Sequence, residues 1–246
     1  MNEYAEVVVL LDELSKRKEQ RKIWTYFPDK GPLRRELYPK HLEFFMAGRT
    51  YRERCFMAAN RIGKTESAGG YETTLHLTGL YDDVSPWWQG KRFKRPIRAW
   101  AAGKTNETTR DIVQRKLFGP VVGSGSTKFV AGTGLIPGQL IKEIRWKQGV
   151  ADLIDYAEIQ HASGDVSILG LKSYQQGRGA FEGTEQDLIW LDEEPPLDVY
   201  GECLIRTATT NGIIIITFTP LDGMTEVATS FLQNGKIPED NDACGI

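Results

Sequence analysis

The stretch that decides the fold reads Cys55-Phe56-Met57-Ala58-Ala59-Asn60-Arg61-Ile62-Gly63-Lys64-Thr65. Its apolar beginning predicts a short strand, and a tight loop then leads into a helix that starts near Gly63. The spacing is that of the phosphate-binding loop G-x-x-x-x-G-K-S/T, with Ala58 in the place of the first glycine. A strand-to-helix turn that binds no phosphate would contain the same elements. The apolar strand before the loop and the helix-compatible run after it favour phosphate binding.

This loop has the chemistry that a nucleoside triphosphate requires. Gly63 lets the main chain approach a phosphate without a Cβ atom in the way. Lys64 would reach the β- and γ-phosphates, and the Thr65 hydroxyl would hold Mg²⁺. The helix dipole favours negative charge at this helix start, where main-chain N–H groups point at the phosphates. The predicted cofactors are therefore ATP and Mg²⁺, and the predicted phosphate-binding residues are Ala59, Asn60, Arg61, Ile62, Gly63, Lys64 and Thr65.

Composition restricts the class of protein. The chain has 246 residues, 40% of them hydrophobic, which is enough for one large α/β domain. The net charge of −2 does not indicate a general nucleic-acid binder, so any DNA contact is expected to be local. The three cysteines are scattered and odd in number, which favours a reducing, intracellular compartment. Only three histidines are present and no Cys/His cluster occurs, which argues against a zinc site. No apolar run approaches the roughly 18 residues of a membrane span, so no membrane association is expected.

Strands and helices alternate along the rest of the chain. Apolar strands are predicted over 97–102, 187–192 and 213–219, with helices over 105–118, 197–208 and 225–234. The run over 213–220 is almost entirely apolar or β-branched, which is typical of a central parallel strand covered on both faces. Two short runs, 156–161 and 166–171, predict a β-hairpin at the edge of the sheet. The fold class is therefore α/β, with a mainly parallel, doubly wound sheet, helices on both faces and a small β-hairpin addition.

A second motif supports the first. The strand Leu188–Leu191 is followed by Asp192, Glu193 and Glu194. At the carboxyl end of a parallel strand, Asp192 would emerge in the crevice where the phosphate loop also opens and would bind Mg²⁺. Glu193 is predicted to polarise the attacking water as general base, with Glu194 as the second choice. Acids that merely end a strand are common, but the pairing with an upstream phosphate loop favours ATP hydrolysis.

Threonine and arginine complete the predicted catalytic set. Thr217 and Thr219 end the strand expected beside that of the acids, where their hydroxyls would sense the γ-phosphate or simply satisfy main-chain groups. A cation on the developing charge accelerates phosphoryl transfer, from the same or a neighbouring subunit. Arg61 and Arg178 are the candidates for this role, although a lone arginine is more often a surface ion-pair residue.

Each of two further segments has both a functional and a structural interpretation. Tyr38, just before a short helix that Pro39 opens, and His41, within that helix, would contact the nucleotide base, or would pack as ordinary core residues. The stretch 86–96 interleaves tryptophans with lysines and arginines. It favours nucleic-acid contact slightly over an exposed loop with partly buried aromatic residues.

With these motifs in order, the chain resembles the ATPase half of the large terminase subunit of tailed bacteriophages. The resemblance rests on 59–65, on Ser173-Tyr174-Gln175-Gln176-Gly177-Arg178-Gly179-Ala180-Phe181-Glu182-Gly183-Thr184, on 189–196 and on 217–224. It implies an additional-strand (ASCE) P-loop NTPase that drives double-stranded DNA into a procapsid in the host cell cytoplasm. The implied partners are a portal protein, a small terminase subunit and further copies of the chain in a ring, expected to be a pentamer.

The resemblance also implies roles for particular residues. Lys64 and Thr65 match the phosphate and Mg²⁺ ligands, Asp192 the Walker B acid, and Glu193 the catalytic base. The threonines at 217 and 219 match the coupling motif, and Arg178 the intersubunit arginine finger. His41 stands where the family usually has a base-reading glutamine, and Arg61 lies one place later than the loop arginine of many relatives.

The expected domains are an N-terminal helical extension over 1–37, the P-loop ATPase domain over 38–235 and a polar tail over 236–246. Only about two dozen residues follow the strand that ends at Thr219, too few for the nuclease domain usual in the family, so no DNA cutting is expected from this chain. Two other functions stay open: a helicase-like nucleic-acid-dependent ATPase, and a truncated nucleotide-binding remnant without catalysis.

Overall fold

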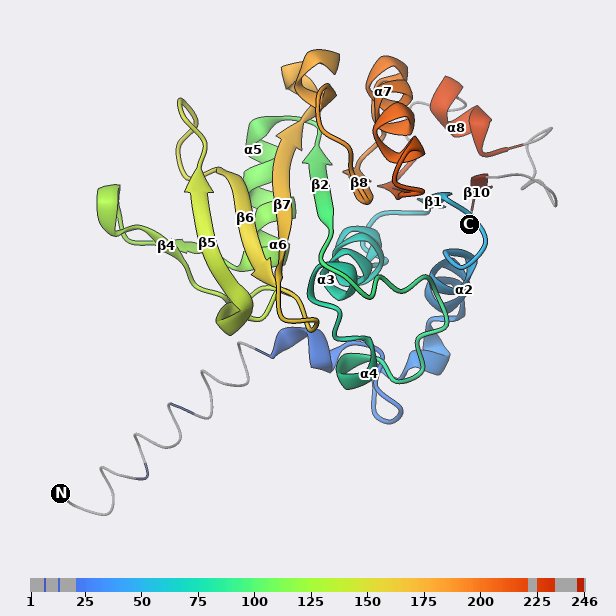
Figure 1. Ribbon diagram of the computed structural model, residues 1–246. Coiled ribbons are helices and arrows are strands. Elements are labelled where there is room, and N and C mark those ends of the chain that lie inside the picture. Colours follow the sequence, from blue (N-terminus) through green and yellow to red (C-terminus); the bar gives the residue numbers. More distant parts are fainter. Residues whose placement is uncertain (1–6, 8–12, 14–20, 221–224, 233–242, 246) are drawn as a thin grey trace.

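The structure, a computed structural model, describes residues 7, 13, 21–220, 225–232 and 243–245. Most of the predicted N-terminal extension up to residue 20 and most of the predicted tail lie outside these residues. The described part contains an eight-stranded sheet with the strand order β10-β1-β9-β8-β2-β7-β6-β5, flanked by helices (Figure 1). The predicted α/β class is confirmed.

Four parallel strands form the centre of the sheet, namely β1 (Glu53–Met57), β2 (Arg98–Gly103), β8 (Leu188–Asp192) and β9 (Ile213–Phe218). The strand β9 lies between β1 and β8, with Ile216 opposite both Cys55 and Leu191. This inserted strand makes the sheet one of the additional-strand type. It also puts the carboxyl ends of β1 and β8 at the same edge, two strands apart.

The strand addition at the edge of the sheet is larger than the predicted hairpin. The hairpin itself is formed by β6 (Ile154–Gln160) and β7 (Val166–Ser173), and β7 pairs in parallel with β2. A third strand, β5 (Ile141–Trp146), extends it antiparallel to β6. The glycine-rich stretch 119–139 contains a two-stranded ribbon of β3 (Val121–Val122) and β4 (Phe129–Val130). In the predicted polar tail, β10 (Ala243–Gly245) pairs in parallel with β1 and so belongs to the sheet.

The helices are α2 (Pro39–Ala47), α3 (Tyr71–Thr78), α4 (Tyr81–Val84), α5 (Asn106–Thr108), α6 (Arg115–Phe118), α7 (Leu197–Ala208) and α8 (Glu226–Ser230). Two π-helical segments, Lys64–Gly70 and Thr109–Gln114, lead into α3 and α6. Pro39 opens α2 as predicted, and Gly48 is the C-cap residue of this helix. In the described residues, no helix is both long enough and apolar enough to span a bilayer.

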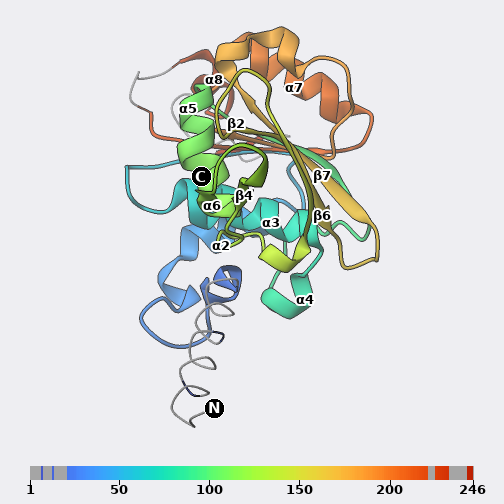
Figure 2. The ribbon, with the colours of Figure 1, turned by 90° about the vertical axis from the view of Figure 1, so that its left-hand side faces the viewer.

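The sheet separates two cores, because side chains alternate between the faces of a strand. Trp190 and Ile215 face one core, together with α3 and α6. Leu191 and Ile216 face the other, together with α7 and α8. Figure 2 shows α7 and α8 above the central strands and α3 below them. The strands β8 and β9 are buried along their whole length, and their almost unbroken apolar sequences follow from this burial on both faces.

A buried ion pair joins the strand of the phosphate loop to the helix after it. The Arg54 guanidinium in β1 donates two hydrogen bonds to the Glu72 carboxylate in α3, at 2.9 and 2.6 Å, and both side chains are fully buried. His76 also contacts Glu72, at 3.0 Å. Burial raises the pKa of Glu72, but the charge of Arg54 and the hydrogen bonds with His76 and Arg54 together outweigh it, and the net pKa is lowered. The pair therefore stays charged and fixes β1 against α3.

Two segments outside the sheet belong to the main core. Ile23 and Phe27, in the predicted N-terminal extension, are buried there. In the stretch 86–96, Trp88 and Phe93 are also buried, and Arg95 is paired with an aspartate. The structure therefore favours the packing explanation of this stretch over nucleic-acid contact.

Candidate functional site

The phosphate loop forms the tight strand-to-helix turn that its sequence predicts, and Gly63 allows this turn in two ways. Gly63 has a φ angle of 90°, in the left-handed region that favours glycine. A Cβ atom on Gly63 would lie 2.5 Å from the Ser67 hydroxyl oxygen, so there is no room for one. Arg61 is also left-handed, with a φ angle of 66°, and lies exposed in the loop. The loop therefore turns sharply before Lys64 begins the helix.

Lys64 is buried at the base of the loop and contacts two of the motifs. Its ammonium donates to the Ala59 carbonyl at 2.8 Å and to the Thr219 hydroxyl at 2.7 Å. Burial lowers the pKa of Lys64, while the charges of Glu193 and Asp192 act to raise it. The structure thus brings Lys64 and both acids together, although the acids lie more than 120 positions further along the chain.

Asp192 ends β8 in an environment that is costly for a charge. Its side chain is 3% exposed, and burial raises its pKa from 3.8 to about 7. Hydrogen bonds from Thr217 and Thr65 act in the opposite direction. The Thr65 hydroxyl and the Asp192 carboxylate are the oxygen donors that Mg²⁺ prefers, and Mg²⁺ takes only one or two protein ligands beside waters and phosphates. These two residues therefore fit a Mg²⁺ ion. The described residues contain no group of three or more His, Cys, Asp or Glu side chains that would indicate another metal site.

Glu193 and Glu194 differ in what they contact. Glu193 is exposed and left-handed, with a φ angle of 64°. Its N–H donates to the Thr217 carbonyl at 2.8 Å. The Glu194 carboxylate instead accepts a hydrogen bond from Thr225, the N-cap residue of α8. Because Glu194 is engaged in this cap, the geometry keeps Glu193 as the better candidate for the base.

The two coupling threonines connect the loop to the acids. The indole N–H of Trp190 donates to the Thr217 hydroxyl at 2.9 Å, and Thr217 donates to Asp192 at 2.8 Å. Because an indole only donates, the Thr217 proton must point at the carboxylate. Trp190 also packs so closely on Gly69 that a Cβ there would lie 2.2 Å from the indole nitrogen. Sequence reasoning missed Trp190, whose one signal is an aromatic residue in an otherwise aliphatic strand.

Thr219 lies between the phosphate loop and β9. Its hydroxyl accepts from Lys64 and donates to the Asn60 side chain at 2.8 Å. A phosphate that accepts a hydrogen bond from the Lys64 ammonium would compete with the Lys64–Thr219 hydrogen bond. The position of Thr219 therefore suits a group that responds to an occupied site.

Tyr38 and His41 face the phosphate loop across a cavity of about 470 Å³ that Arg61, Ile62 and Gly63 also line. His41 is 5% exposed and its Nε2 atom has no hydrogen-bond partner. Burial lowers the pKa of His41 to about 4, so the ring is neutral at pH 7. The same ring packs against aromatic neighbours. Both the base-contact and the packing interpretations are therefore compatible with the structure.

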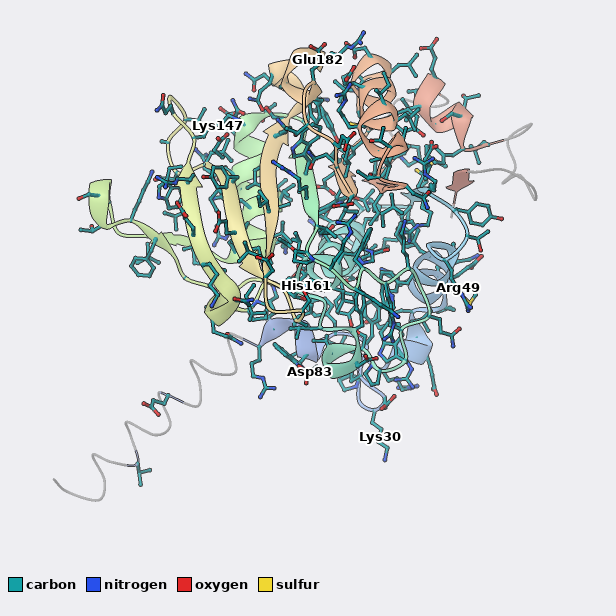
Figure 3. All side chains as sticks on the ribbon, in the orientation of Figure 1. Lys30, Arg49, Asp83, Lys147, His161 and Glu182 are labelled. Carbon is teal, nitrogen blue, oxygen red and sulfur yellow. The ribbon has the colours of Figure 1, made fainter. Side chains whose placement is uncertain are left out.

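Arg178 lies apart from the phosphate loop. It opens the turn Arg178–Phe181 and its guanidinium is 3.0 Å from the Glu202 carboxylate in α7. Its side chain is 54% exposed. Figure 3 labels Glu182, which follows this turn, at the top of the molecule near α7, at the end opposite Lys30. Arg178 is thus accessible to a neighbouring molecule, but its ion pair would have to open first.

Comparisons with known proteins identify the family. The family described as terminase large subunit, T4likevirus-type, N-terminal, matches residues 55–242. The terminase large subunit of Salmonella phage P22 is 36% identical over 248 aligned residues, which cover 94% of this chain and 46% of that protein. This chain therefore spans about half the length of the curated relative that it matches.

One solved structure supports the fold, and a second has a slightly lower similarity. A mutant of the large terminase ATPase domain of Thermus phage P74-26 has a TM-score of 0.50 at 15% identity, over 80% of this chain and 75% of that chain. The large terminase of the thermophilic bacteriophage D6E in complex with ADP has a TM-score of 0.49 at 13% identity, over 94% and 44% of the two chains. Since the family match covers most of the sequence and the P22 relative confirms it, this chain belongs to the terminase large subunit family and corresponds to its N-terminal part.

Proposed function

We propose that this chain is the ATP-hydrolysing motor domain of a phage terminase large subunit, which drives double-stranded DNA into a procapsid. The observation that supports it best is the meeting of Lys64, Asp192 and Glu193 at one edge of the sheet. An ammonium for the phosphates, a carboxylate for the metal and an exposed carboxylate for the water are the parts that phosphoryl transfer needs.

Each residue then has one task. The main chain over 59–63 and the Lys64 ammonium bind the phosphates, and Tyr38 and His41 contact the base. Thr65 and Asp192 would hold Mg²⁺, which when bound neutralises charge on the phosphates. Glu193 takes a proton from the attacking water. In this proposal the hydroxyls of Thr217 and Thr219 sense the γ-phosphate and couple its presence to the rest of the domain.

The proposed partners follow from the family. They are double-stranded DNA, a portal protein, a small terminase subunit and further copies of this chain in a ring, in the host cell cytoplasm. The ring would bring Arg178 to the nucleotide of the next copy as an arginine finger, with Arg61 as a candidate within the same chain. Binding by Arg178 would have to exchange its ion pair with Glu202 for one with phosphate oxygens.

Replacement of Glu193 by Gln tests the catalytic assignment. We expect ATP affinity to persist, because the phosphate ligands are untouched, while turnover falls by about 10²- to 10⁴-fold through loss of the base. Glu194→Gln is the matched control, since it removes the neighbouring carboxylate, and it should keep turnover within a few-fold. Unchanged turnover in Glu193→Gln would reject Glu193 as the base. A wild-type chain that binds ATP and never hydrolyses it would identify a non-catalytic remnant instead.

Mixing two inactive variants tests the arginine finger. In a ring, an Arg178→Ala subunit keeps its own base, and a Glu193→Gln subunit keeps its own arginine. If Arg178 acts between subunits, a mixture should regain part of the activity at interfaces where an intact arginine meets an intact base. No gain under conditions that assemble the ring would contradict this role.

A further inference from the structure

Tyr174 lies beneath the acids that end β8. It is the first residue of the turn Tyr174–Gln176 after β7, and it is 6% exposed. Its hydroxyl is 2.9 Å from the carbonyl oxygen of Glu193 and 3.1 Å from that of Asp192. A phenol has a single proton to donate, so the two carbonyls share one donor. Tyr174 therefore contacts the main chain of both acids, a role that its place in the stretch 173–184 did not indicate.

The main chain at Glu193 needs this support. A φ angle of 64° at a residue with a side chain costs on the order of 1 kcal/mol or more and persists only where the surroundings impose it. On one side, the Glu193 N–H donates to Thr217 in β9. On the other, the Glu193 carbonyl accepts from Tyr174. These two hydrogen bonds fix the peptide planes that determine where the exposed Glu193 carboxylate points.

The same tyrosine also touches the turn that carries Arg178. Its ring packs against Phe181, with the ring centroids 6.4 Å apart, and Phe181 is fully buried. The ammonium of Lys172 holds the same turn by donating to the Ala180 carbonyl at 2.5 Å. One buried side chain thus joins the main chain of the proposed base to the turn of the proposed finger.

We propose that Tyr174 is a positioning residue that holds Glu193 in its left-handed conformation and ties it to the Arg178 turn. This inference rests on the proposed role of Glu193 as the base. Without the hydroxyl, the Glu193 peptide relaxes towards ordinary φ values, and its carboxylate spends less time where it can take a proton from the attacking water. The phosphate loop is untouched, so the effect belongs to the rate of hydrolysis and not to nucleotide binding.

The test compares Tyr174→Phe with Tyr200→Phe. Tyr200 is 5% exposed and donates its hydroxyl to Glu53, so each variant loses one buried tyrosine hydrogen bond. We expect both to lose about 1–3 kcal/mol of stability in urea unfolding. Only Tyr174→Phe should lower kcat for ATP with Mg²⁺, by about 10- to 100-fold, since small misplacements of catalytic groups cost that much. KM and the affinity for a fluorescent ATP analogue should stay within about twofold. Equal kcat in the two variants would overturn the proposal.

Combination with Glu193→Gln separates this inference from the proposed function. If Tyr174 acts through Glu193, adding Tyr174→Phe to Glu193→Gln should leave the residual single-turnover rate unchanged. The same fold loss in both backgrounds would refute positioning through Glu193. Full turnover in Glu193→Gln alone would refute the base itself. Loss of turnover in Glu193→Gln, with Tyr174→Phe matching Tyr200→Phe, would remove only the role of Tyr174.

Discussion

Replacing Asp192 by Asn removes a negative charge that the folded protein accommodates at a cost. The side chain is 3% exposed, and burial raises its pKa from 3.8 to about 7. Because the folded pKa lies above the unfolded value, the folded residue keeps a proton in a pH range where the unfolded residue has lost it. Stability from this residue therefore falls as pH rises from about 4 to about 7. The two titrations give a cost of about 2 kcal/mol at pH 5 and about 4 kcal/mol at pH 8.5.

The amide of Asn carries no charge and can still accept the hydrogen bond from Thr217. Without metal and nucleotide, we therefore expect Asp192→Asn to be more stable than the wild type, with an advantage that grows by about 2–3 kcal/mol between pH 5 and pH 8.5. The same variant should lose turnover, because a metal ligand is gone. A variant that gains stability and loses activity is typical of a site where a catalytic group is held in an environment that destabilises it.

Urea unfolding in EDTA at the two pH values measures the difference. Asp82 provides the control: its side chain is 86% exposed, so Asp82→Asn should change stability by less than about 1 kcal/mol at either pH. An Asp192→Asn protein that is no more stable than the wild type at pH 8.5 would refute the reasoning. So would an advantage of the same size at both pH values.

Three further substitutions probe the frame around the site. Glu72→Ala leaves the Arg54 charge buried and unpaired and should cost about 3–5 kcal/mol in urea unfolding; a loss below about 1 kcal/mol would show that the pair is not needed. Gly69→Ala places a Cβ against the indole of Trp190 and should cost about 1–3 kcal/mol, measured in the same way; an unchanged midpoint would mean that the indole can move aside. Lys64→Ala should weaken ATP binding about 10- to 100-fold in a fluorescence titration, since a charged hydrogen bond is lost; normal binding would reject the phosphate-loop assignment.

The sequence alone determined the elements whose signals are local. Helix α7 has the predicted bounds Leu197–Ala208, and the apolar run Ile213–Phe218 is a central parallel strand. Such runs can be predicted because burial on both faces of a sheet imposes an unbroken apolar pattern on neighbouring residues. The phosphate loop and the acids after β8 could be predicted for a similar reason, since each places its chemistry within a few adjacent positions. That the loop and the acids lie close together could also be predicted, because ligands bind where the carboxyl ends of parallel strands share one edge of the sheet.

Only the tertiary structure decided which side chains complete the site. Thr219 contacts Lys64 because β9 is inserted between β1 and β8, and the order of strands in a sheet is not the order along the chain. Trp190 and Tyr174 reach their partners across different strands and turns, through hydrogen bonds that have no sequence pattern. The physical reason is that local propensities shape each element, whereas packing of distant elements chooses the partners of each polar group.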